Sequence, residues 1–426
     1  MAVSQKVFRF YAEKREGYNI LAKNILADVK KTLKLEGLKD LRIIDRYLIQ
    51  GVTGEEFDSA VKKALTEKNT DIVYDVLPEP LPPHSFWLEA LPGQFDQAAD
   101  SASQCIALST EGERPLVQTA RLYAFEGDIT EAEFERIIKY INNPVETRLT
   151  KDDLPESIEI VSGPVADVVR ENGFIKLDNE SLKAFHAEHG FAMSFEDILF
   201  VKNYFAEQEN RDPSITELKM IDTYWSDHCR HTTFFTKLED VQIEKDGLSW
   251  VIEDAFRNYL ETRKQVYADR QKDISLMDMA TIAAKSLKKR GLLADLDESD
   301  EINACSIVRE IEVDGQKETW LIQFKNETHN HPTEIEPFGG ASTCLGGAIR
   351  DPLSGRAYVY QAMRITGAAN PNTPYDDTLE GKLAQKTITV KASEGYSAYG
   401  NQIGAATGQV TEIYDEGYVA KRMELG

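Results

Sequence analysis

Strand-like and helix-like segments alternate over the first 141 residues, and this alternation limits the possible folds more than any other feature of the chain. Stretches rich in branched and aromatic residues are followed by stretches with apolar residues at helical spacing. The predicted strands cover residues 7–14, 41–49, 71–77, 86–91 and 115–125, and the predicted helices cover residues 19–34, 55–65, 94–107 and 131–141. A proline cluster between Pro78 and Pro83 separates two halves of similar length. We therefore predict an α+β module over residues 1–150 that is internally duplicated.

The charge balance restricts the partners of the chain. Its 426 residues include 49 Lys and Arg and 72 Asp and Glu, which gives a net charge of −23. So acidic a chain repels phosphate backbones and anionic lipids, so we expect neither nucleic acid nor a membrane as partner. There is no apolar run of transmembrane length and no signal-peptide core at the N-terminus. The four cysteines lack the spacing of a zinc or disulfide framework, which indicates reduced thiols in a cytoplasmic protein.

Residues 151–215 are predicted to form a helical linker. A helix is expected from Ser194 through Phe205. Ser214 and Glu217 then have the spacing of a capping box, in which each side chain bonds the backbone N–H of the other residue. The helix that follows leads into WSDHCRH, residues 225–231.

Two histidines of this motif, His228 and His231, are three residues apart and can share one helical face, with Asp227 as a partner. Three interpretations remain open at this point. A histidine could orient or deprotonate a substrate, two histidines could bind zinc, or a histidine could cap the helix C-terminus. We favour the first, because no second ligand pair with zinc spacing occurs.

The richest chemistry lies between Thr319 and Asp351. Residues 304–313 and 318–325 are predicted to form a hairpin that turns at Asp314-Gly315. If the extended conformation continues past this hairpin, one face carries an ammonium, a carboxylate and two imidazoles, from Lys325, Glu327, His329 and His331.

A loop with two glycine pairs is expected next, Gly339-Gly340 and Gly346-Gly347, ending at Arg350-Asp351. Glycine lets backbone N–H groups approach an anion, an arginine can bind phosphate, and carboxylates suit magnesium. The alternative is that the glycines mark plain turns. No Walker A sequence follows them. We predict a site for a magnesium nucleotide and a phosphorylated substrate.

Further helices are predicted over residues 249–270 and 275–290, and further strands over residues 356–365 and 386–392. The glycine-rich residues 400–410 are expected to form a loop. The sequence ends without a helix and cap, which we interpret as a cut between domains.

The two motifs WSDHCRHTTF and FKNETHNHPTEIEPFGGASTCLGGAIRD, in this order, resemble phosphoribosylformylglycinamidine synthases of the large, single-chain type. The resemblance implies an α+β fold in three parts. These are a duplicated ferredoxin-like module (residues 1–150), a helical linker (151–215), and the first ATP-binding half of a domain like aminoimidazole ribonucleotide synthetase (216–426). It also implies an N-terminal fragment without the second synthetase half and the glutaminase domain.

The implied reaction is the fourth step of purine synthesis. ATP activates the amide oxygen of formylglycinamide ribonucleotide, and ammonia from glutamine displaces phosphate to give the amidine, with Mg2+ as cofactor. The isolated fragment is expected to be inactive. Alternatives are another synthetase of the same ATP-binding superfamily, such as selenophosphate synthetase, or a non-catalytic nucleotide-binding scaffold that docks a glutaminase.

The resemblance also implies a role for individual residues. The catalytic residues would be His228 and His329. The ATP-binding residues would be Lys325, Gly340, Gly346, Gly347 and Asp351. The substrate-binding residues would be Thr328, Asn330, His331 and Arg350. The magnesium ligands would be Glu327 and Asp351.

Overall fold

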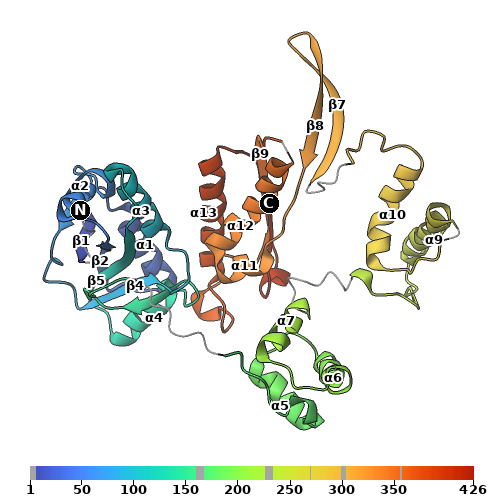
Figure 1. Cartoon of the computed structure of the whole chain (residues 1–426), viewed down its shortest axis with the longest axis horizontal. Coiled ribbons are helices and arrows are strands. Elements are labelled where there is room, and N and C mark those ends of the chain that lie inside the picture. The colour runs from blue at the N-terminus through green and yellow to red at the C-terminus, as the bar shows by residue number, and fades with distance from the viewer. Residues whose placement is uncertain (1–5, 160–166, 226–233, 269, 299–303, 356) are drawn as a thin grey trace. The chain divides into compact units, whose positions relative to one another are not determined.

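The computed structural model describes residues 6–159, 167–225, 234–268, 270–298, 304–355 and 357–426 (Figure 1). The chain divides into two compact units. The first comprises Met1–Gly163, Glu327–Gly346 and Gln361–Gly426, and the second comprises Pro164–Asn326 and Gly347–Tyr360. None of the helices in these described ranges has the length and apolar character of a membrane span. The architecture is mixed α+β, with an antiparallel sheet and a helical linker.

The N-terminal part of the first unit is a six-stranded sheet with the order β3-β1-β2-β5-β4-β6, in which every neighbouring pair is antiparallel. Its strands are β1 (Val7–Lys14), β2 (Leu38–Gln50), β3 (Asp71–Tyr74), β4 (His84–Ala90), β5 (Leu116–Gly127) and β6 (Thr147–Thr150). Its helices are α1 (Ile20–Leu33), α2 (Gly54–Ala60), which a π-helical turn over Val61–Leu65 extends, α3 (Gln97–Thr110) and α4 (Glu131–Ile141). All the strands and helices predicted for residues 7–141 are confirmed; β1 and α4 have the predicted ends, and the ends of the other elements are shifted.

The helices cover one face of this sheet because most residues of the central strands that alternate onto this face are apolar; the paired Asp45 and Arg121 are exceptions. Leu41 of β2 packs with α1 and α4, and Ile49, on the same face, packs with α2 and α3. The opposite face buries Ile44 and Trp87 beneath the chain that follows β3, including Leu77.

The helical linker begins the second unit and has its own apolar core. Its helices are α5 (Asn179–His189), α6 (Phe195–Tyr204) and α7 (Ile215–Trp225), which bury Leu182, Ile198 and Leu218 together. The predicted capping box is present: the Ser214 N–H donates to Glu217 Oε2 at 2.7 Å, and the Glu217 N–H donates to Ser214 Oγ at 3.2 Å.

The second unit continues with α9 (Ser249–Tyr267) and α10 (Leu276–Lys289), followed by a two-stranded hairpin. Its strands β7 (Cys305–Val313) and β8 (Gln316–Phe324) are antiparallel. Asp314 and Gly315 join them with φ angles of 51° and 80°, the left-handed pair that a tight hairpin turn requires. The predicted helices and hairpin are confirmed.

The remaining elements differ more from expectation. They are α11 (Asn330–Ile335), α12 (Pro337–Ser354), β9 (Gln361–Ala368), α13 (Gln385–Ile403), β10 (Ala406–Tyr414) and β11 (Met423–Leu425). The strands form a sheet with the order β10-β9-β11, in which β9 and β10 are parallel.

The strand predicted for residues 386–392 is wrong, because this segment lies inside α13. Its branched residues favour a strand locally, but Ile388, Ala392 and Tyr396 recur every four residues and are buried as one helical stripe. The loop predicted for residues 400–410 is also wrong. Gly404, with a φ angle of 73°, ends α13, and β10 begins two residues later.

Candidate functional site

The chain leaves β8 at Phe324 and enters the segment predicted to carry the chemistry. Lys325 and Asp351, which are 26 positions apart, meet directly: Lys325 Nζ lies 2.8 Å from Asp351 Oδ2. The two side chains are 22% and 37% exposed, so the ion pair is partly shielded from water and remains open to a ligand. Both residues belong to the second unit. An ammonium and a carboxylate are thus held together where the sequence predicts contacts with ATP and a metal.

Glu327, Thr328 and His329 belong to the first unit, where they run antiparallel to the last three residues of the chain. The N–H of Glu327 donates to Gly426 O at 2.9 Å, and the N–H of His329 donates to Glu424 O at 3.0 Å. Thr328 forms a bridge with Leu425 between them. Thr328 is exposed, whereas Glu327 and His329 are half-buried.

The extended conformation does not reach His331, so the predicted face shared by four side chains is wrong at that residue. The helix α11 starts at Asn330 and places His331 and Pro332 in its first turn. The first N–H groups of a helix have no partner within it, so proline is tolerated there and its fixed φ favours the turn. His331 is exposed on α11.

The glycine loop predicted between Gly339 and Asp351 is also wrong, because Pro337–Ser354 form α12. Gly340 faces the backbone of α11, and a Cβ there would lie 2.4 Å from Thr333 N. A Cβ on Gly346 would lie 3.1 Å from the Tyr399 ring of α13. Close packing of helices thus accounts for these two glycines. Gly347, Arg350 and Asp351 follow on α12.

The helix α12 begins at a cleft of about 760 Å³ within the first unit, which Glu336 and Phe338 line together with Glu146 of the N-terminal module. Asn143 Nδ2 donates to Ile335 O at 2.9 Å beside it. Burial, and then the neighbouring carboxylate of Glu336, raise the pKa of Glu146 to about 8. Glu336 Oε1 accepts the N–H of Gly339 at 2.8 Å and gains from the helix N-terminus, so the shared proton resides on Glu146.

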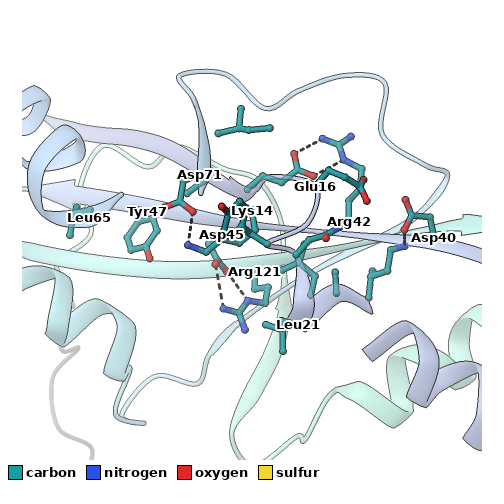
Figure 2. A pocket seen from close by; sticks show the side chains of 18 residues that line it. Lys14, Glu16, Leu21, Asp40, Arg42, Asp45, Tyr47, Leu65, Asp71 and Arg121 are labelled. Carbon is teal, nitrogen blue, oxygen red and sulfur yellow. Dashed lines mark hydrogen bonds and ion pairs between the residues drawn. The ribbon is translucent and has the colours of Figure 1, made fainter. Parts of the chain in front are cut away.

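A second cleft, of about 480 Å³, is lined mainly by residues of β1, β2 and α1 in the N-terminal module (Figure 2). Its three cationic side chains are each paired with a carboxylate. Arg121 Nε lies 2.6 Å from Asp45 Oδ1, and Lys14 Nζ lies 2.5 Å from Asp71 Oδ1 (Figure 2). Arg42 binds both carboxylate oxygens of Glu13, at 2.9 and 2.8 Å. These charges hold the strands to one another, and we assign this cleft no ligand.

Sequence reasoning placed Cys344 in this region but assigned it no role. Its buried thiol donates to Glu327 O at 3.4 Å and lies 3.2 Å from the Tyr396 hydroxyl. Burial raises the pKa of the Cys344 thiol to about 11. No local pattern distinguishes this residue, because its neighbours come from other parts of the chain.

The predicted catalytic residue His228 lies outside the described residues, as do Asp227, Cys229 and His231. Within the described ranges, no group of three or more His, Cys, Asp or Glu side chains could hold a metal ion by itself.

Comparison with known proteins indicates the class of protein to which this chain is similar. Residues 182–231 match the family described as the formylglycinamide ribonucleotide amidotransferase linker domain. This match begins within α5, includes α6 and α7, and ends with the WSDHCRH motif.

The particular relatives agree with that class. The chain is 27% identical over 238 residues to phosphoribosylformylglycinamidine synthase of Drosophila melanogaster, which is 53% of this chain and 16% of that protein. It is 26% identical over 227 residues to the synthase subunit PurL of Thermoplasma acidophilum, covering 53% of this chain and 22% of the subunit. The Deinococcus radiodurans PurL subunit is 33% identical over 111 residues, 25% of this chain and 14% of that subunit.

Over about half of its length, therefore, the chain is related to phosphoribosylformylglycinamidine synthases. It spans less than a quarter of the length of each of these three relatives.

Proposed function

We propose that this chain supplies part of the synthetase site of a phosphoribosylformylglycinamidine synthase. The whole reaction would convert formylglycinamide ribonucleotide, ATP and ammonia from glutamine into formylglycinamidine ribonucleotide, ADP and phosphate. The observation that carries the proposal is the 2.8 Å contact of Lys325 with Asp351, which joins an ammonium suited to phosphate with a carboxylate suited to a metal ion. The names of the relatives support it.

In this proposal, the amide oxygen of the substrate attacks the γ-phosphorus of ATP, and ADP leaves. Ammonia then adds to the activated carbon, and phosphate leaves with the former amide oxygen. Lys325 would bind phosphate oxygens and offset the charge that develops on them. Arg350, exposed on α12, would bind the phosphate of the ribonucleotide as a planar fork.

The donor set suits magnesium. Mg2+ takes one or two carboxylates and completes its octahedron with water and substrate phosphates, so it needs no cluster of protein ligands. Glu327 and Asp351 are half-buried carboxylates that would hold it. When bound, the ion would spread the negative charge of the transferred phosphoryl group.

Proton transfers fall to the histidines. His329 is anchored through its backbone, which suits a side chain that must meet the amide nitrogen or the incoming ammonia at a set position. We propose His228 as the second such group. Thr328, Asn330 and His331 would contact the ribonucleotide.

On α12 we retain Gly340, Gly346 and Gly347 as proposed ATP-binding positions, now as parts of a helix and not of a loop. We also propose that the chain has three parts, a duplicated ferredoxin-like module over residues 1–150, a linker over 151–215 and a synthetase half over 216–426. The reaction would need a glutaminase and a second synthetase half beyond this chain.

Binding of Mg-ATP to this chain tests the proposal. Isothermal titration calorimetry should show that Lys325→Ala and Asp351→Asn each weaken binding by roughly tenfold or more, because a charge-assisted contact is worth roughly 1.5–3 kcal/mol. Lys317→Ala is the matched control, since Lys317 lies at the start of β8 beside Glu310, at 3.8 Å. Equal affinities in all variants would refute the nucleotide site.

The reaction itself is tested in the complete synthase assembly. Substrate labelled with ¹⁸O in the reacting amide should deliver the label to inorganic phosphate. Label that stays in the ribonucleotide would exclude activation of the amide oxygen by phosphoryl transfer.

A further inference from the structure

The segment that carries Glu327 and His329 is held to the end of the chain by a short ladder of hydrogen bonds. Glu327 and Gly426 exchange two backbone bonds of 2.9 Å, and the His329 N–H donates to Glu424 O at 3.0 Å. The N–H of Glu424 donates in return to the Asn330 side chain, with a distance of 2.9 Å to Oδ1. The position of this segment therefore follows the position of Glu424.

Glu424 is in turn held between two buried arginines. Its side chain is 0% exposed, and Arg364 and Arg422 are 5% and 1% exposed. Arg364 Nε donates to Glu424 Oε1 at 2.9 Å, and Arg422 Nη2 lies 2.8 Å from Glu424 Oε2. Arg364 also pairs with Glu412, at 2.8 Å, whereas the ion pair of Arg422 is with Glu424, so a shift of the Glu424 carboxylate would separate Arg422 from its carboxylate partner.

The cluster of Arg364, Arg422 and Glu424 is also connected to the segment from Glu327 to Asn330 through side chains. The guanidinium group of Arg364 lies 5.1 Å from the centre of the Tyr396 ring. The Tyr396 hydroxyl lies 3.2 Å from Cys344 Sγ, and this thiol donates to Glu327 O at 3.4 Å. Two routes, one through the β11 backbone and one through side chains, thus connect Arg364 with the backbone of Glu327.

Stability alone gives little reason for such a cluster. Burying ions is costly, and apolar side chains of the same volume often stabilise a core as well or better. The hydrogen bonds and ion pairs of a buried polar network do, however, restrict the arrangement of the backbone around it. Arg422 is energetically costly, because Nε, Nη1 and Nη2 of Arg422 make no hydrogen bond of suitable geometry within the described residues, and its contact with Glu424 Oε2 is an ion pair only.

We infer that Glu424 and Arg364 are positioning residues that hold Glu327 and His329 in the geometry needed for phosphoryl transfer and proton transfer. Neither would touch substrate. This inference rests on the proposed function, because it assigns the placed segment to the synthetase site. A misplacement of about 1 Å costs roughly 100-fold in rate, so disturbing the cluster should lower kcat and leave the KM for ATP nearly unchanged.

Amide hydrogen exchange in this chain tests the placement without any assay of activity. In Glu424→Gln and Arg364→Lys, the amides of Glu327 and His329 should exchange roughly tenfold faster or more, because their local opening becomes easier. Glu412→Gln is the matched control: Glu412 Oε1 accepts Arg364 Nη1 at 2.8 Å, and its other hydrogen-bond partners within the described residues, Thr366 and Tyr414, lie outside the segment. Its exchange at both amides should stay near the original rate.

Glu424→Gln removes the carboxylate paired with buried Arg422 and one of the two paired with Arg364, so this variant could fail to fold. Asn330→Ala then provides the second comparison, because it removes only the acceptor for the Glu424 N–H, whereas Asn330→Asp keeps an oxygen there. Unchanged exchange at Glu327 and His329 in both Arg364→Lys and Asn330→Ala would overturn the inference.

The kinetic consequence is measured in the complete synthase. Arg364→Lys should reduce kcat by roughly 100-fold, with the KM for ATP altered by less than about threefold. A loss confined to KM would contradict positioning. If the unaltered assembly has no ligase activity, the proposed function fails, while the exchange experiment still decides whether Glu424 and Arg364 place the segment.

Discussion

Replacing Glu146 by glutamine should raise the free energy of unfolding of the protein, and this increase should become larger as the pH rises. The folded structure raises the pKa of the Glu146 carboxyl to about 8 from an ordinary value of 4.5, by burial and by the adjacent Glu336. Below pH 4.5 the carboxyl is protonated in both the folded and the unfolded chain, so it contributes no penalty. Between pH 4.5 and about 8, the unfolded chain releases this proton and the folded chain retains it, so the free energy of unfolding falls as pH rises.

The difference between 4.5 and about 8 corresponds to roughly 5 kcal/mol at about 1.4 kcal/mol per pKa unit, which is an upper limit. Glu146 is half-buried, and solvent screening reduces the expected penalty to about 2 kcal/mol. Glutamine carries no charge and its amide can still donate to the Glu336 carboxylate, so Glu146→Gln should recover this amount at pH 8.5 and almost nothing at pH 4.5.

The assay is urea unfolding of both proteins at intervals between pH 4.5 and 9, with the difference in unfolding free energy plotted against pH. Glu126→Gln is a suitable control, because Glu126 is exposed at the end of β5. A difference that stays flat across this range, or a variant that is less stable at pH 8.5, would refute the reasoning.

The remaining predictions concern packing and thiol chemistry. Gly340→Ala should destabilise the fold by about 1–3 kcal/mol in urea unfolding, because its Cβ would lie 2.4 Å from Thr333 N; Gly400→Ala, whose nearest neighbour would be at 3.8 Å, should be neutral or stabilising. Equal effects of the two substitutions would argue against tight packing of α11 on α12. Cys344, with a thiol pKa raised to about 11, should react with iodoacetamide far more slowly at pH 8 than exposed Cys105, as measured by peptide mass spectrometry. Comparable rates would show that Cys344 is accessible.

Local pattern was sufficient for most of the N-terminal module and the linker. In α4, a helical apolar stripe coincides with a capping box of Thr130 and Glu133, and the predicted and observed ends of the helix are identical. Helix propensity, capping and burial all favour a helix at these positions, so a short window of sequence is enough to predict it. The Asp314-Gly315 turn follows for the same reason, because few other residues adopt its left-handed backbone.

The glycine pairs show where local reasoning fails. Glycine suits a phosphate-binding loop and it also suits close helix packing, since both need the space of a missing Cβ. What distinguishes them is the neighbour that fills that space. For Gly340 the neighbour is the backbone of α11, and for Gly346 it is the ring of Tyr399. These neighbours are set by tertiary structure, so the residue type alone could not decide between the two.

The sequence by itself determined which residues carry charge and chemistry, and where most strands and helices of the N-terminal module and linker lie, because those properties depend on side chains within a few positions of one another. Only the tertiary structure decided that Lys325 meets Asp351, and that Glu424 between two arginines supports the segment from Glu327 to Asn330. Apart from the pair of Arg422 and Glu424, these contacts join residues from 26 to 94 positions apart. Their geometry arises when α12, β9 and β11 pack together, and this packing cannot be read from the periodicity of any one segment.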